Sequence, residues 1–259
     1  MLSVYIQNFM KFRPLLTELV ARDIKIKYRR SVLGVLWTVL NPLFMMVILA
    51  IVFSNLFKFD IENYPVYILS GQVIYNFFNE STSSSMSAIL NNAALLKKVY
   101  IPKYLFVVSR ILSSIINVLA AHCALLIVMV ATGVELSWTT LLFPIPLFFL
   151  ILFCLGIGLM LSAVAVKFRD IIHLYGVFVT GFMYLTPVIY AMSLLPGWLY
   201  NIVKWNPITN YLMIYRDVML NASIPDPLSV IVAAAEGVGV LLLGLVVFAK
   251  KQDTFILNI

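Results

Sequence analysis

Residues 32–56 read VLGVLWTVLNPLFMMVILAIVFSNL and contain no charged side chain. A helix needs about 20 consecutive apolar residues to cross the hydrocarbon core of a bilayer, so this stretch predicts a transmembrane helix. The composition of the whole chain agrees, since 63% of its 259 residues are hydrophobic and only 11% are charged. A soluble domain has about a quarter of its residues charged. The sequence therefore predicts an all-α integral membrane protein.

Five further stretches share the length and apolar character of residues 32–56. Together they predict six transmembrane helices, at residues 32–56, 64–87, 104–131, 141–166, 171–191 and 228–248. Strands of a membrane β-barrel are only about 10 residues long and alternate between apolar and polar residues. The six stretches are longer and more uniformly apolar, which favours helices. Of the six stretches, the one at residues 64–87 is the most polar.

The basic residues predict how the chain is oriented. With six spans both termini lie on the same side, and that side carries all but three of the 18 Lys and Arg residues; the exceptions are Lys58, Lys204 and Arg216. Because Lys and Arg are concentrated in cytoplasmic segments, both termini are predicted to be cytoplasmic. The net charge of +7 is then a signal of topology. The chain offers no soluble basic face for nucleic acid.

The segments outside the spans define the organisation of the chain. Residues 1–31 form a cytoplasmic N-terminus, residues 32–250 a single transmembrane domain, and residues 251–259 a cytoplasmic tail. Residues 14–30 predict an amphipathic helix in the membrane interface, which serves either as an anchor or as a docking surface for a cytoplasmic partner. Residues 192–227 predict two short outer helices that dip back into the membrane. The cytoplasmic loops are too short for a catalytic domain.

One face of the second span is polar, although hydropathy places it inside the membrane. The face consists of residues that recur every three or four positions: Gln72, Asn76, Asn79, Glu80, Ser83, Ser84, Ser87 and Asn91. Such a face cannot point at lipid, because unsatisfied polar groups are costly there. It packs against other helices, lines a hydrated path, or belongs to a helix that has left the membrane by Ser81.

The third span favours the hydrated path. Arg110, Ser113, Ser114 and Asn117 also share one helix face, in the same half of the membrane. Tyrosine and phenylalanine side chains of the second and fifth spans suit contact with sugar rings, because a tyrosine presents an apolar face and a hydroxyl together. We predict a channel lined by Asn41, Tyr67, Gln72, Tyr75, Asn76, Asn79, Glu80, Ser83, Ser84, Ser87, Phe182 and Tyr190.

Motifs for catalysis or nucleotide binding are absent from the sequence. It contains no G-x-x-x-x-G-K-[ST], no G-x-S-x-G and no H-E-x-x-H. Cys123 and Cys154 lie inside spans without metal-ligand spacing, and His122 and His173 have no convergent partners, so all four are interpreted as structural. We therefore predict no cofactor or metal in this chain and a transport function that draws energy from an ion gradient or a separate ATPase.

Six motifs, in order along the chain, resemble a known family. They are DIKIKYRRSVLGVLWTVLNPLFMMVILAIVFSNLF (23–57), YILSGQVIYNFF (67–78), NAALLKKVYIPK (92–103), FRDI (168–171), TPVIY (186–190) and NPITNYLMIYRDVML (206–220). The chain resembles the permease subunits of ABC-2-type polysaccharide exporters. These export lipid-linked O-antigen, and the exporters of teichoic acid and capsule are close relatives.

The resemblance implies a homodimer of six-helix permeases in the bacterial inner membrane, bound to two ATPase subunits that hold ATP and Mg. The polymer path would lie at the dimer interface, and residues 92–103 would form the coupling helix on the ATPase. The implied contacts to the ATPase are Arg22, Leu95, Leu96, Lys97, Lys98, Tyr100, Pro102, Arg169 and Asp170.

Two other function classes remain open. A drug or small-lipid permease of the same superfamily would have a narrow apolar cavity. A membrane-embedded sugar transferase would need several convergent carboxylates or histidines, whereas Asp23 and Asp170 are the only plausible cytoplasmic acids and both lie in basic clusters.

Overall fold

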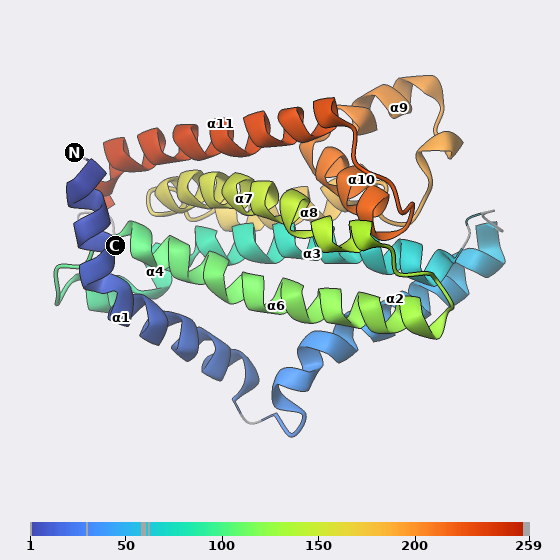
Figure 1. Ribbon diagram of the computed structural model, residues 1–259. Helices are drawn as coiled ribbons and strands as arrows, with labels where there is room; N and C mark the ends of the chain where they lie inside the picture. The colour runs from blue at the N-terminus through green and yellow to red at the C-terminus, as the bar shows by residue number, and fades with distance from the viewer. Residues whose placement is uncertain (1, 30, 58–60, 62, 256–259) are drawn as a thin grey trace.

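The computed structural model describes residues 2–29, 31–57, 61 and 63–255, and the regular structure of these residues is helical throughout. Four long helices, α3, α6, α7 and α11, run roughly side by side (Figure 1). Helices α1 and α2 form a V beside them, while α9 and α10 lie at the end of the bundle opposite the two chain termini. The predicted tail, residues 251–259, is described only as far as Phe255, and Lys58 lies outside the described residues. The helices are α1 (Leu2–Tyr28), α2 (Trp37–Phe57), α3 (Tyr64–Met86), α4 (Ala88–Asn91), α5 (Ala93–Leu96), α6 (Tyr104–Ala131), α7 (Pro144–Ala165), α8 (Ile171–Tyr184), α9 (Gly197–Lys204), α10 (Pro207–Met219) and α11 (Pro227–Lys251), with short 3₁₀ turns at Gly34–Leu36, Trp138–Leu142, Met192–Leu194 and Gln252–Thr254.

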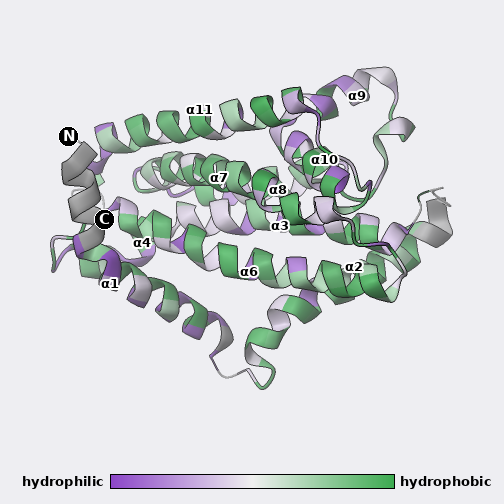
Figure 2. Ribbon diagram, in the orientation of Figure 1, coloured by the Kyte–Doolittle hydropathy of each residue, from purple (hydrophilic) through white to green (hydrophobic). Residues whose placement is uncertain are grey.

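Four of the six predicted spans are long and apolar enough to cross a membrane. They correspond to the stretches Gly34–Phe53, Tyr104–Ala131, Trp138–Ala165 and Pro227–Thr254. In Figure 2 the helices α6, α7 and α11 are hydrophobic over most of their length, whereas the coloured part of α1 alternates between hydrophilic and hydrophobic residues and part of α3 is hydrophilic. Helix α3 has 23 residues, which is enough length, but its polar residues lower its hydropathy. The count of six spans therefore stays a prediction.

The fifth predicted span is shorter than the sequence indicates. Helix α8 has 14 residues and ends at Tyr184 rather than Ala191, so it is about 21 Å long against about 30 Å of hydrocarbon. Pro187 explains the end, because a proline lacks an N–H and disfavours helical geometry in the residue before it. The irregular backbone that follows is held by side chains: Asn206 donates to the carbonyl of Leu185 and to the hydroxyl of Thr186, both at 3.0 Å.

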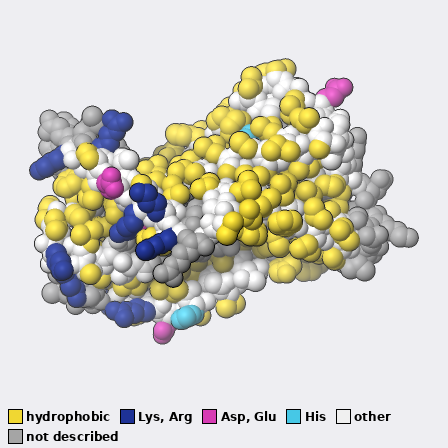
Figure 3. Space-filling view, turned by 90° about the horizontal axis from the view of Figure 1, so that it is seen from below, with side chains coloured by type: hydrophobic (Ala, Val, Ile, Leu, Met, Phe, Trp, Pro, Cys, Tyr) yellow, Lys and Arg dark blue, Asp and Glu magenta, His cyan; other side chains and the backbone are white. Residues whose placement is uncertain are grey.

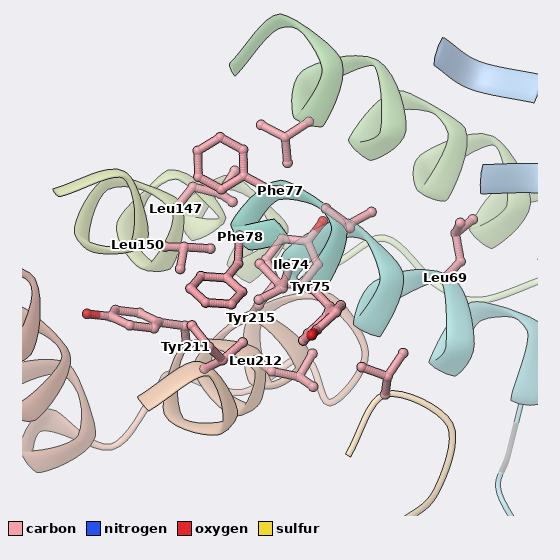
Figure 4. Close-up of a cluster of buried hydrophobic side chains, with 14 of the residues drawn as sticks. Leu69, Ile74, Tyr75, Phe77, Phe78, Leu147, Leu150, Tyr211, Leu212 and Tyr215 are labelled. Atoms are coloured by element: carbon pink, nitrogen blue, oxygen red, sulfur yellow. The ribbon is translucent and has the colours of Figure 1, made fainter. Parts of the chain in front are cut away.

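The most polar span lies in the middle of the bundle. Helix α3 contacts α2, α6, α7, α8 and α10. The apolar side chains of α3, including Ile74, Phe77 and Phe78, pack against Leu147 and Leu150 of α7 and against the buried face of α10 (Figure 4). The neighbouring helices therefore shield α3 from lipid, which is how a membrane helix can accommodate polar residues.

Glycines allow α7 and α11 to pack in close contact. A Cβ atom on Gly156 would lie 2.3 Å from the carbonyl oxygen of Val240, and one on Gly244 would lie 2.4 Å from the carbonyl oxygen of Gly156. Small residues at such crossings let helix backbones approach each other in membranes. Gly158 instead faces α3, where a Cβ would lie 2.7 Å from Cβ of Ser85.

Two segments outside the spans differ from their predicted bounds. Helix α1 begins at Leu2, so Pro14 lies inside it and removes one backbone hydrogen bond there. The predicted coupling helix, residues 92–103, is helical only over Ala93–Leu96 before Tyr104 begins α6. Pro102 again disfavours helical geometry in the preceding residue.

The two short helices predicted in residues 192–227 are present as α9 and α10. Asn206 accepts a hydrogen bond from the backbone N–H of Ile208 at 2.9 Å, and Pro207 follows it in the first turn. This is the N-cap and first-turn proline pattern of a helix start. That the two helices are re-entrant stays a prediction.

Candidate functional site

A cavity of about 670 Å³ lies where α1, α2, α3 and α6 meet. Its polar wall comes from α3 and its opposite wall from the first turns of α2. Six predicted channel residues line it together: Asn41, Gln72, Tyr75, Asn76, Asn79 and Glu80. Lys27, Trp37 and Thr38 also line it and were not predicted, and Asn117, expected on the hydrated face of the third span, lines it too. The polar face of α3 is therefore divided, and only its first half, from Gln72 to Glu80, lines the cavity.

The serines of the predicted channel face lie outside this cavity. The hydroxyl of Ser83 donates to Oδ1 of Asn79 at 3.1 Å, that of Ser84 to the carbonyl of Ser81 at 3.2 Å, and that of Ser87 to the carbonyl of Ser84 at 3.3 Å. Serine hydroxyls on helices commonly bond to the preceding turn in this way. Their role as lining residues stays a prediction.

Of the four predicted aromatic residues, only Tyr75 lines the cavity, and the other three lie outside it. Tyr67 donates its hydroxyl to the carbonyl of Tyr190 at 2.8 Å, and Tyr190 donates to that of Tyr184 at 2.8 Å. Phe182 instead lines a separate apolar pocket of about 310 Å³ on the other side of α3, together with Phe78. Their contact with a substrate also stays a prediction.

Glu80 is the acidic residue among those that line the cavity, and side chains of two other helices bind it. Nζ of Lys27, in the last turn of α1, lies 2.6 Å from Oε1 of Glu80. Asn117 of α6 donates its amide to the same oxygen at 2.6 Å. A carboxylate in a membrane helix is expected to be paired. The partner Lys27 was missed because it lies 53 residues away, in a segment interpreted only as an interface helix.

A second charge cluster joins α1 to α6 and to the start of the predicted coupling segment. The buried carboxylate of Asp23 lies 3.0 Å from Nη1 of Arg110 and 3.3 Å from Nη2 of Arg22. Arg22 also donates to Oδ1 of Asn92 at 2.9 Å. Arg110, expected on a hydrated face, is therefore bound to α1. Arg22, predicted to contact an ATPase, bridges α1 to the segment that begins at Asn92.

The remaining residues predicted to contact the ATPase differ in how exposed they are. Lys97, Lys98 and Tyr100 are exposed, and Arg169 and Asp170 are exposed in the loop before α8. Leu96 is buried, and Leu95 and Pro102 are half-buried. In Figure 3 the Lys and Arg side chains gather at one end of the molecule, and the rest of that face is largely hydrophobic. The exposed residues fit a docking surface, whereas Leu96 anchors the segment to the core.

Arg216 is a residue whose burial the sequence interpretation did not predict. It was counted as a basic residue on the outer side, but it is buried in α10. Its guanidinium donates to the carbonyls of Tyr67, Pro187 and Val188 at 2.8–3.1 Å and lies 3.5 Å from the ring centroid of Tyr67. The signal was available, because Arg216 shares a face of α10 with apolar residues such as Leu212. It holds the irregular segment after α8 against α3.

The two histidines were interpreted as structural, and the contacts of His122 agree with this. Nδ1 of His122 lies 2.6 Å from the hydroxyl of Tyr215, and its ring stacks on Phe143 with the centroids 3.9 Å apart. His173 is exposed in α8. Cys154 is buried, while Cys123 is exposed on α6.

Several apolar helices long enough to cross a membrane, packed around a polar helix that borders a cavity, define a polytopic helical membrane protein with an arrangement typical of transporters. Residues 14–220 match the family described as ABC-2 type transporter, and the chain belongs to this family.

Relatives named as polysaccharide transport proteins match almost the whole chain. The O-antigen export system permease protein RfbA of Myxococcus xanthus is 27% identical over 252 residues, which cover 96% of this chain and 97% of the relative. RfbA of Klebsiella pneumoniae is 26% identical, with 93% of each chain covered. The polysialic acid transport protein KpsM of Escherichia coli is 20% identical, with 91% of this chain and 92% of the relative covered. The resemblance stated from the motifs is thereby confirmed.

Proposed function

We propose that this chain is the permease subunit of an ATP-driven exporter that moves a lipid-linked, O-antigen-like polysaccharide from the cytoplasm across the bacterial inner membrane. The relatives named for O-antigen and polysialic acid transport support the substrate class. The single observation that carries the proposal is the polar cavity along α3, because amides and a carboxylate suit a hydroxyl-rich polymer better than an apolar drug.

The chain is proposed to cross the membrane with both termini in the cytoplasm. The first helix and the end of α11 lie at the same end of the molecule (Figure 1), and basic side chains gather at that end (Figure 3). This agrees with the tendency of Lys and Arg to stay on the cytoplasmic side.

Energy is proposed to come from an ABC ATPase, present in two copies, that binds ATP and Mg. The exposed Lys97, Lys98 and Tyr100, together with Arg169 and Asp170, would contact it. The chain itself is proposed to catalyse no reaction.

A homodimer is proposed to complete the polymer path. One face of α8 leaves Leu174, Val177 and Tyr184 exposed, and a Cβ on Gly176 or Gly181 would have no atom within 4 Å. Small residues on an exposed membrane helix permit close approach of another helix. Two copies would enclose a path wider than the 670 Å³ cavity of a single chain.

The proposal is tested by deleting the gene in its own bacterium. We expect surface polysaccharide to disappear from intact cells, lipid-linked polymer to accumulate inside, and an ATPase to co-purify with the tagged chain. Unchanged surface polymer together with no co-purifying ATPase would overturn the proposal.

The cavity also distinguishes a sugar path from the path of a small apolar substrate. Asn76 lines the cavity and is exposed to it. We expect Asn76→Leu to reduce polymer export at least several-fold, because leucine cannot hydrogen-bond to a passing sugar. Surface polymer is the measurement, and Leu119→Ala, exposed on α6 outside the cavity, is the control. A drug or small-lipid permease would tolerate Asn76→Leu.

The basic coupling segment gives a prediction about the partner. Lys97→Glu with Lys98→Glu reverses two exposed charges, and we expect at least a tenfold loss of co-purified ATPase. Lys250→Glu with Lys251→Glu, two exposed lysines at the end of α11, is the matched control. Equal loss of ATPase in both double variants would show that net charge, rather than this segment, determines binding.

A further inference from the structure

The last turn of α1 closes one side of the cavity. We propose that Lys27 and Asn117 are positioning residues that hold the carboxylate of Glu80 across the mouth of the cavity, and that displacement of α1 breaks the Lys27–Glu80 ion pair and opens the cavity. We call this reversible closure by Glu80 the bar. The inference rests on the proposed function, because it assigns a regulation to the same path.

One carboxylate oxygen joins three helices at this point. Oε1 of Glu80 in α3 lies 2.6 Å from Nζ of Lys27 in α1 and accepts the amide of Asn117 in α6, also at 2.6 Å. All three side chains line the cavity. Asn117 fixes the direction of the carboxylate, while Lys27 brings the end of α1 to it.

The two charge clusters of α1 differ in how firmly they bind. The side chains of Lys27 and Glu80 are 46% and 37% exposed. A pair this open to solvent contributes little stability and exchanges readily with water. Asp23, one turn earlier, is only 5% exposed and pairs with Arg110. Removing a partner from a buried pair is strongly destabilising. Helix α1 is therefore anchored at Asp23 and releasable at Lys27.

The chain beyond Lys27 connects the bar to the opposite wall. It turns at Gly34, whose φ of +51° favours glycine, and enters α2 at Trp37. Trp37 and Asn41 of α2 line the cavity facing α3. A movement of the end of α1 is therefore transmitted along the chain to the α2 wall.

The other end of the linkage lies at the proposed ATPase surface. Arg22, next to the anchor, donates to Asn92, and the exposed Lys97 and Lys98 follow a few residues later. A displacement of the segment that begins at Asn92 is therefore transmitted to α1 through the Arg22–Asn92 hydrogen bond.

The test measures how fast the cavity reacts with a thiol reagent. Asn76→Cys, in a Cys123→Ser and Cys154→Ala background, places a single thiol in the cavity wall. Inside-out membrane vesicles holding the full chain are treated with a membrane-impermeant maleimide. We expect Lys27→Gln, Glu80→Gln and Asn117→Leu each to raise the labelling rate at least threefold, and Lys27→Glu combined with Glu80→Lys to restore the slow rate.

Lys25→Gln is the matched control, because Lys25 is exposed on the same helix and does not line the cavity. It should leave the rate unchanged, and the amount of folded protein is checked for every variant. Unchanged labelling in Lys27→Gln and Glu80→Gln would overturn the bar, as would fast labelling in the charge-swapped pair. Loss of polymer export on gene deletion is scored separately, so a failed bar and a failed transport function give different results.

Discussion

Gly244→Ala should lower the free energy of unfolding by about 3 kcal/mol, the upper end of what overpacking of a core costs. The new Cβ would lie 2.4 Å from the carbonyl oxygen of Gly156, which is backbone and cannot rotate away. Helices α7 and α11 would have to separate. The measurement is thermal unfolding of the purified protein, with its yield in the membrane as a second readout.

Gly239→Ala is the matched control for Gly244→Ala. Gly239 lies on the same helix, and a Cβ there would have no atom within 4 Å. Alanine is a better helix former than glycine by about 1 kcal/mol in water, so this variant should be neutral or slightly stabilised. Equal behaviour of the two variants would mean that α7 and α11 are not packed as described. Gly156→Ala should resemble Gly244→Ala, and the double variant should be less than additive because both changes force the same two helices apart.

Asp23→Leu should cost about 2 kcal/mol and detach α1 from α6. The carboxylate is buried, and its loss leaves Arg110 without the group 3.0 Å away that balances it. Breaking a fully buried ion pair costs about 3–5 kcal/mol, and the value is reduced here because Arg110 is 20% exposed. Thermal unfolding measures the stability, and limited proteolysis of α1 measures its detachment.

Glu18→Leu is the control for Asp23→Leu, because Glu18 is exposed on the same helix. It should change little. Asp23→Leu combined with Arg110→Leu should recover part of the lost stability, since neither charge is then left alone. If the double variant is as unstable as the sum of its parts, the pair does not act as a unit.

Helix positions follow from hydropathy where a stretch of sequence is long and largely apolar. The predicted span at residues 104–131 coincides with α6, and the polar span at residues 64–87 differs from α3 by one residue. The fifth span was predicted too long because residues 185–191 are apolar, so their hydropathy does not distinguish helix from irregular backbone. Only Pro187 marks the break, and a single proline inside a membrane helix does not always end it, as Pro42 of α2 shows.

The sequence predicted that a polar cavity exists and named part of its lining, but it did not give the full set of lining residues. A polar face on α3 implied polar neighbours or water, and six of the expected residues do line one space. The pairing of Glu80 with Lys27 and the burial of Arg216 depend on how distant segments pack, and helical periodicity reports only which residues share a face. Serines on that face bond to their own helix, an option that periodicity does not reveal.

Helix α2 has very little protein around it. Only 6% of its most apolar window is buried inside the chain, compared with 50% for the span that contains α7. When such a helix shifts sideways, one set of lipid tails replaces another and almost no apolar surface meets water, so the hydrophobic effect gives little resistance. The first span is therefore the wall of the cavity that can move sideways at the lowest cost in free energy.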